Sequence, residues 1–216
     1  NFKYFYKTYI EYIHKDDFPN PLSYNRFIEL MPRLFLPLNI LMYMLVGKRT
    51  GTYFIDTTPI KVCHNRRQSN NKVFRGLARY SKSTMGYFFG FKLHLIINER
   101  GEFIALKITK GNVDDRASVL ELTKNLVGTL YADKGYIKQN LFVTLKEKIL
   151  LRKRTLIETV FGYLKNTLNI EHSRHRSPVN AFVNILAALV AYSLKKNKPS
   201  IKFNFHSDFN NSLIQN

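Results

Sequence analysis

The middle of the chain alternates between apolar and polar positions in the way that is typical of β-strands. Residues 86–98 are apolar at every second position on one face and carry Lys92 and His94 on the other, which predicts a half-buried strand. The segment TYFIDTTPIKV, bounded by Gly51 and Pro59, is rich in β-branched and aromatic residues and predicts a buried strand. Residues 103–109 predict a third strand, and the connections favour an antiparallel meander.

The apolar period changes to that of a helix after this meander. Asp114 and Asp115 are suited to cap a helix from Arg116 to about Val127. Gly128 ends that helix, and a fourth short strand, TLYAD, comes after it. Further helical patterns cover residues 138–148, 150–168 and 179–196, and the last of these starts at Ser177 and Pro178.

These patterns predict an α/β protein in three parts. Residues 1–50 form an irregular helical region, in which Ser23 is a plausible N-cap and Pro32 and Pro37 interrupt the helical pattern after it. Residues 51–196 form a sheet of mixed strand direction with helices on its faces, and residues 197–216 form a polar tail. We expect the N-terminal region to bind DNA.

The charge narrows the choice of partner. The chain of 216 residues has 34 Lys and Arg against 15 Asp and Glu, a net charge of +19, which disfavours most small-molecule enzymes and indicates a polyanionic partner. Hydrophobic residues make up 45% of the chain, too many for a disordered basic tail. The single Cys63 cannot form a disulfide within the chain. No signal peptide or membrane anchor is recognised, and the apolar run Val179–Leu194 predicts a core helix, so we expect a cytoplasmic, nucleoid-associated protein.

Two carboxylates on predicted strands suggest a metal site. Asp56 lies within an apolar strand, where a carboxylate is costly unless it meets a cation, although it could also cap a local turn with Thr57 or Thr58. Asp133 ends the fourth strand, and ligands gather at such strand ends in α/β sheets. Mg²⁺ prefers oxygen ligands of this kind.

A third carboxylate lies on the predicted helix 150–168. At 100° per residue, its apolar side chains form one stripe, and Arg154, Glu158 and Lys165 lie along a single line at the edge of that stripe. The same spacing suits ordinary ion pairs on a helix surface. Together with Asp56 and Asp133, Glu158 completes a set of three carboxylates that could hold two metal ions for displacement at phosphorus.

A basic segment supplies candidate contacts to a nucleic-acid backbone. It runs from Lys61 to Lys92, contains no acidic residue, and includes several aromatic residues that could stack on unpaired bases. The alternative is a solvated basic loop. Its candidate DNA-binding residues are Arg66, Arg67, Lys72, Arg75, Arg79 and Lys82.

Six ordered blocks resemble a known family. The strings YFIDTTPIKVCHNRR, GYFFGFKLHLIIN, KGNVDDR, ADKGY, RTLIETVFGYLKN and IEHSRHRSP are similar to those of bacterial insertion-sequence transposases with a DDE domain, close to insertion-sequence family nine-eighty-two. The resemblance runs from about Ser23 to Pro199. It implies a ribonuclease-H-like fold, Mg²⁺ or Mn²⁺, DNA as partner (terminal inverted repeats and target DNA), and a homo-oligomer in the synaptic complex.

The resemblance also implies residue roles. Asp56, Asp133 and Glu158 match the catalytic, metal-binding triad, and Arg154 and Lys165 match DNA-contacting positions of the pattern Tyr-x2-Arg-x3-Glu-x6-Lys, in which Leu151 replaces the Tyr. Relatives place a further strand between the second Asp and the Glu, where this sequence has a helical pattern. We therefore expect an internally deleted copy with a truncated N-terminus. Such a copy could be inactive and only bind DNA, and a ribonuclease-H-type nuclease is a further alternative.

Overall fold

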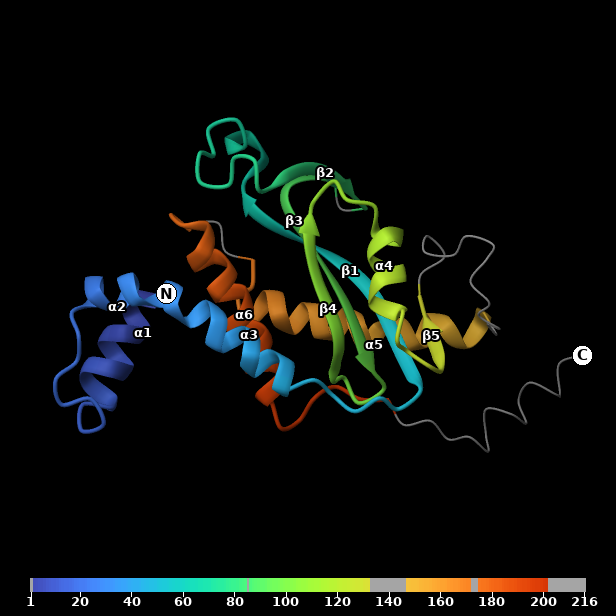
Figure 1. Cartoon of the computed structure of the whole chain (residues 1–216), viewed down its shortest axis with the longest axis horizontal. Coiled ribbons are helices and arrows are strands. Elements are labelled where there is room, and N and C mark those ends of the chain that lie inside the picture. Colours follow the sequence, from blue (N-terminus) through green and yellow to red (C-terminus); the bar gives the residue numbers. More distant parts are fainter. Residues whose placement is uncertain (1, 85, 133–146, 172–174, 202–216) are drawn as a thin grey trace, which may run out of the picture.

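The protein folds around one mixed β-sheet. The structure is a computed structural model that describes residues 2–84, 86–132, 147–171 and 175–201, with the side chains of 147–154 excepted. Five strands form the sheet: β1 (Thr52–Cys63), β2 (Arg79–Ser83), β3 (Gly86–Asn98), β4 (Phe103–Lys110) and β5 (Thr129–Tyr131). The predicted α/β class with a sheet of mixed direction is confirmed (Figure 1).

Strand β3 organises this sheet. It pairs antiparallel with β1 along one edge and with β2 and then β4 along the other, while β5 pairs parallel with the start of β1. The antiparallel pairing of the three predicted strands is therefore confirmed. Strand β2 was not predicted, because its sequence RYSKS has no apolar alternation, and it lies within the segment that was expected to be a loop.

Proline and a side-chain hydrogen bond explain two differences from the predicted bounds. Pro59 does not end β1, which continues to Cys63. Because β5 pairs only with residues 52–54 of β1, the edge of β1 beside Pro59 needs no N–H donor, and proline is tolerated there. Helix α4 (Asp115–Thr123) ends before Val127. The Thr123 hydroxyl donates to the Val119 carbonyl (2.8 Å), and this side-chain bond competes with continuation of the helix.

Helices cover both faces of the sheet. On one face, α5 (Glu147–Asn166) and α6 (Pro178–Leu194) enclose the larger apolar core, and on the other α4 encloses a smaller one (Figure 1). Strand β3 is therefore buried on both faces: Leu95 and Ile96 are each fully inaccessible to solvent. The prediction that this strand is half-buried was wrong, because α4 covers the face that carries Lys92 and His94.

The N-terminal region is helical, as predicted, and its last helix packs against α6. The side chain of Ser23 accepts a hydrogen bond from the Arg26 N–H, which confirms the predicted N-cap. Pro32 lies at the start of a 3-10 turn and Pro37 in the first turn of a helix, where no intrahelical donor is needed, so neither ends the helical path. The elements are α1 (Phe2–Phe5), the π-helix η1 (Tyr6–Ile13), α2 (Tyr24–Leu30), the 3-10 helix η2 (Met31–Leu34) and α3 (Phe35–Met44).

Two apolar helical segments differ in burial. Helix α6 begins at Pro178 with Ser177 as its N-cap and contributes eight buried residues, which confirms the predicted core helix. The segment Tyr24–Met44 is, by length and composition alone, apolar enough to cross a membrane, with a mean hydropathy of 1.3 and 6% of it buried. The sequence pattern did not single out this second segment.

Candidate active site

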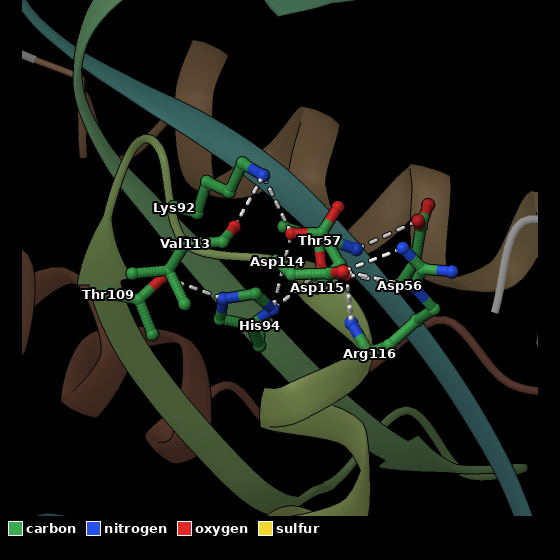
Figure 2. Close-up of polar contacts among 9 residues, drawn as sticks. All are labelled: Asp56, Thr57, Lys92, His94, Thr109, Val113, Asp114, Asp115 and Arg116. Carbon is green, nitrogen blue, oxygen red and sulfur yellow. Dashed lines mark hydrogen bonds and ion pairs between the residues drawn. The ribbon is translucent and has the colours of Figure 1, made fainter. Parts of the chain in front are cut away.

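Asp56 lies near the middle of β1, on the sheet face that α5 covers. It is opposite Leu95 of β3 in the register and comes two residues after Phe54, a core residue on the same face. The side chain is half-buried, and its Oδ1 accepts a hydrogen bond from the Thr57 N–H at 2.8 Å (Figure 2). The alternative that Asp56 caps a local turn is wrong, because Thr57 and Thr58 continue β1, but the hydrogen bond restricts the orientation of the carboxylate.

Glu158 lies on α5 at the edge of a buried stripe, as predicted. The neighbouring side chains of Ile157 and Val160 are almost completely buried, whereas Glu158 is exposed. Helix α5 contacts both β1 and β5, and its apolar stripe shares one core with Phe54. Two of the three predicted carboxylates thus belong to elements that pack directly on each other.

The third predicted carboxylate, Asp133, lies outside the described residues. The strand before it is described: β5 runs parallel to β1, and Phe54 and Tyr131 are opposite each other with their rings stacked at 5.2 Å. Among the described residues, no group of three or more His, Cys, Asp or Glu side chains is placed to hold a metal ion. Carboxylate oxygens are the ligands that Mg²⁺ and Mn²⁺ prefer, and the role of Asp56 and Glu158 as metal ligands stays a prediction.

Arg154 and Lys165 are the two cations predicted beside Glu158. The side chain of Arg154 lies outside the described part of the structure. Lys165 forms an ion pair with Glu171 (3.3 Å), and the Glu171 Oε1 also accepts a hydrogen bond from the Lys61 N–H (2.9 Å). Lys165 is therefore partly neutralised within the protein, and its contact with DNA stays a prediction.

The six basic residues predicted to bind DNA are all exposed. They lie on the 3-10 helix η3 (Asn65–Arg67), on β2 and between them, rather than on one continuous loop. We call this set the basic surface: Arg66, Arg67, Lys72, Arg75, Arg79 and Lys82. Lys92, at the end of the same segment, differs, because it forms a partly buried ion pair with Asp115 (2.9 Å).

Only part of the aromatic content of this segment is available for stacking. Phe74 and Phe88 are buried in the protein, so the expectation that they face a nucleic acid was wrong. Tyr80 and Tyr87 are exposed and stack on each other. The difference arises from strand alternation and from the apolar core beneath the basic segment.

His94 is the centre of a polar network that the sequence did not reveal. Its ring is completely buried, with Nδ1 at 2.8 Å from the Thr57 hydroxyl and Nε2 at 2.8 Å from the Thr109 hydroxyl (Figure 2). Burial lowers the pKa of His94 to about 4, despite the opposing effect of Asp115. This network links β1, β3 and β4 on the face opposite to Asp56, one residue from that carboxylate.

The start of α4 has the predicted cap. Asp114 accepts a hydrogen bond from the Arg116 N–H (3.0 Å). It also forms an ion pair with the Arg116 guanidinium (2.7 Å). These hydrogen bonds lower the pKa of Asp114 to about 2. Asp114 is thus a helix cap, the role expected from the sequence.

One family of proteins matches this chain over most of its length. A family model described as a transposase DDE domain matches residues 46–148 and 142–178. The matched region contains Asp56, Glu158 and the mixed sheet, and the fold is consistent with a ribonuclease-H-like arrangement. Comparisons with curated proteins and with solved structures gave no match.

Proposed function

Because the chain belongs to the transposase DDE domain family, we propose that it is the transposase of an insertion sequence, close to family nine-eighty-two, and that it cuts and joins DNA at element ends. The observation that carries the proposal is the packing of α5, with Glu158, on the sheet face that bears Asp56. Its partners are the terminal inverted repeats and a target DNA, and two ends brought together require a homo-oligomer. We propose a cytoplasmic, nucleoid-associated location for the same reason.

We propose Asp56, Asp133 and Glu158 as the catalytic residues. Phe54 of β1 and Tyr131 of β5 are opposite each other on parallel strands. Asp56 comes two residues after Phe54 in the sequence, and Asp133 comes two residues after Tyr131. Residues at equal offsets on parallel strands are neighbours when the pairing continues, which supports a shared role for the two aspartates. The expected internal deletion falls in residues 134–157 and stays a prediction.

The three carboxylates would hold Mg²⁺ or Mn²⁺, which would supply an activated water and neutralise charge at the phosphate. In the first step, a water oxygen bonds to phosphorus and the P–O3′ bond breaks, so that the element end gains a free 3′-hydroxyl. In the second, that hydroxyl attacks a target phosphodiester and releases a target 3′-hydroxyl. The hydrogen bond from the Thr57 N–H orients Asp56, and Arg154, Lys165 and the basic surface hold phosphates.

Cleavage of a duplex that carries candidate terminal repeats tests this proposal. We expect cutting with Mn²⁺ and none with EDTA, and a loss on the order of 100-fold or more in Asp56→Asn, Asp133→Asn and Glu158→Gln, each with DNA binding retained. Glu121→Gln is the matched control, since it removes an exposed carboxylate on α4, on the other face of the sheet.

Three results would contradict the proposal in different ways. Undiminished cleavage in the three variants refutes the assignment of the triad. DNA binding without any metal-dependent cutting identifies a non-catalytic remnant of a transposase. Equal cutting of repeat-bearing and scrambled duplexes identifies a general nuclease of ribonuclease-H type.

A further inference from the structure

Two tyrosine rings, from β2 and from the start of β3, form an exposed stack. The rings of Tyr80 and Tyr87 have centroids 5.3 Å apart and planes that differ by 2°, and the residues are 43% and 53% exposed. The other stacked pairs among the described residues of the sheet domain belong to the apolar core: Phe103 with Tyr192, and Phe54 with Tyr131. Burial of apolar surface therefore does not account for the arrangement of Tyr80 and Tyr87.

The register of β2 and β3 holds this pair in place. Tyr80 is opposite Phe89, and Lys82 is opposite Tyr87, so that the two tyrosines are diagonal neighbours on one face of a two-stranded ribbon. The Lys82 Nζ lies 5.6 Å from the centre of the Tyr87 ring. The pairing of β2 with β3 therefore holds the two tyrosine rings and the Lys82 ammonium group next to one another.

The segment that carries the stack has charges of one sign. Arg79 precedes Tyr80 and is exposed, and the rest of the basic surface comes from the same segment, which has no acidic residue between Lys61 and Lys92. Exposed rings among cations are the combination that binds single-stranded nucleic acid, in which bases stack on rings and phosphates meet the cations.

The stack also lies on the same sheet face as Asp56. Asp56 is opposite Leu95, and Tyr87 precedes Leu95 by an even number of residues on β3, so both side chains project to one face. At about 3.3 Å per residue, Tyr87 is roughly 26 Å from Leu95 along the strand. This is about the length of eight base pairs. One DNA strand can therefore span both places.

We propose that Tyr80 and Tyr87 stack on unpaired bases of the DNA substrate, while Lys82 and Arg79 contact the adjoining phosphates. This inference rests on the proposed function, because it names the state of the DNA that the transposase holds. Within a duplex the faces of each base are covered by its neighbours, so only an unpaired base offers a free face to the tyrosine rings. Bare duplex DNA needs the cations alone.

Binding of fluorescent oligonucleotides, measured by anisotropy in EDTA so that no cleavage occurs, tests the proposal. The double variant Tyr80→Leu with Tyr87→Leu should bind a mixed-sequence single strand about 5- to 100-fold more weakly, with duplex affinity within about 2-fold of wild type. Tyr80→Phe with Tyr87→Phe retains both rings and should bind like wild type. Leu120→Ala, at a residue of α4 that is 61% exposed and lies outside both the basic surface and the N-terminal region, is the matched control.

A second measurement uses the wild-type protein alone and therefore does not depend on how a variant folds. A single strand with several abasic sites keeps its phosphates but lacks base faces, and it should bind more weakly by a similar factor. Equal affinity for abasic and intact strands, or equal losses on single strand and duplex in the leucine variant, would overturn the inference and leave the transposase proposal standing. Absence of binding to any DNA would overturn both.

Discussion

Acidification should destabilise the protein through His94. The ring is fully buried, and its two nitrogens face the hydroxyls of Thr57 and Thr109, which satisfy a neutral ring that donates from one nitrogen and accepts at the other. The charged groups that face it are Asp115, at 4.0 Å from Nδ1, and the lysines 92 and 107. Burial is the largest influence, the lysines act in the same direction, and Asp115 opposes them, so the pKa falls to about 4.

The pKa values of His94 in the folded and unfolded states determine the sign and size of the change in the free energy of unfolding. In the unfolded chain the pKa of histidine is about 6.5, so between pH 6.5 and 4 the unfolded state binds a proton that folded His94 does not. The free energy of unfolding therefore falls as the pH is lowered through this window, by roughly 3 kcal/mol at about 1.36 kcal/mol per pKa unit. The lowered pKa of Asp114 acts at lower pH, between about 3.8 and 2, where its stabilising contribution is lost.

Urea denaturation monitored by far-ultraviolet circular dichroism measures this effect, since the chain contains no tryptophan. The comparison is between wild type and His94→Gln at pH 7.5, 6.5, 5.5 and 4.5, because Gln keeps a donor and an acceptor but does not titrate. We expect the advantage of wild type over the variant to shrink by roughly 2.5 kcal/mol between pH 7.5 and 4.5. An advantage that stays constant over this range would refute the reasoning.

Three further substitutions probe the fold through thermal and urea denaturation. Gly128→Ala should destabilise by more than about 3 kcal/mol, because a Cβ there lies 2.1 Å from the Gly51 carbonyl oxygen and φ is +132°; stability near that of wild type would contradict the close approach of the two strand starts. Gly162→Ala, its control on α5 with nothing within 4 Å of the new Cβ, should stabilise by up to about 1 kcal/mol. Tyr192→Phe removes the donor to the buried Gly101 carbonyl (2.8 Å) and should cost about 1 to 3 kcal/mol, and an unchanged midpoint would show that this bond contributes nothing.

Local signals in the sequence predicted much of the fold. The strand 86–98 has the predicted bounds, and Ser23, Asp114 and Ser177 are the helix caps that their residue types suggested. These features depend on neighbours within a few residues, so local sequence patterns are sufficient to predict them. Strand β2 was missed because its polar residues form a strand only through pairing with β3, a contact that no periodicity in RYSKS indicates.

The sequence predicted which secondary-structure elements carry the candidate site residues, but it did not predict what packs around them. The sequence assigned Asp56 to a strand and Glu158 to the edge of a buried helical stripe, and both assignments are confirmed. The burial of His94 was not predicted, because a polar residue at an alternating position indicates a solvent-facing side unless another element covers it. That cover comes from α4, and the docking of a helix on a sheet face is a tertiary contact that alternation within one strand cannot reveal.

The order of the strands along the chain also governs when the proposed site can assemble during synthesis. The antiparallel pairs β1–β3 and β3–β4 join segments close in sequence, whereas Asp56 and Glu158 are roughly 100 residues apart, which corresponds to about 5 to 20 s of translation. A nascent chain can therefore pair its meander on the ribosome well before α5 emerges to close the core beneath Asp56. An incomplete chain would carry the basic surface without Glu158, so under the proposed function it could contact DNA before it could cut it.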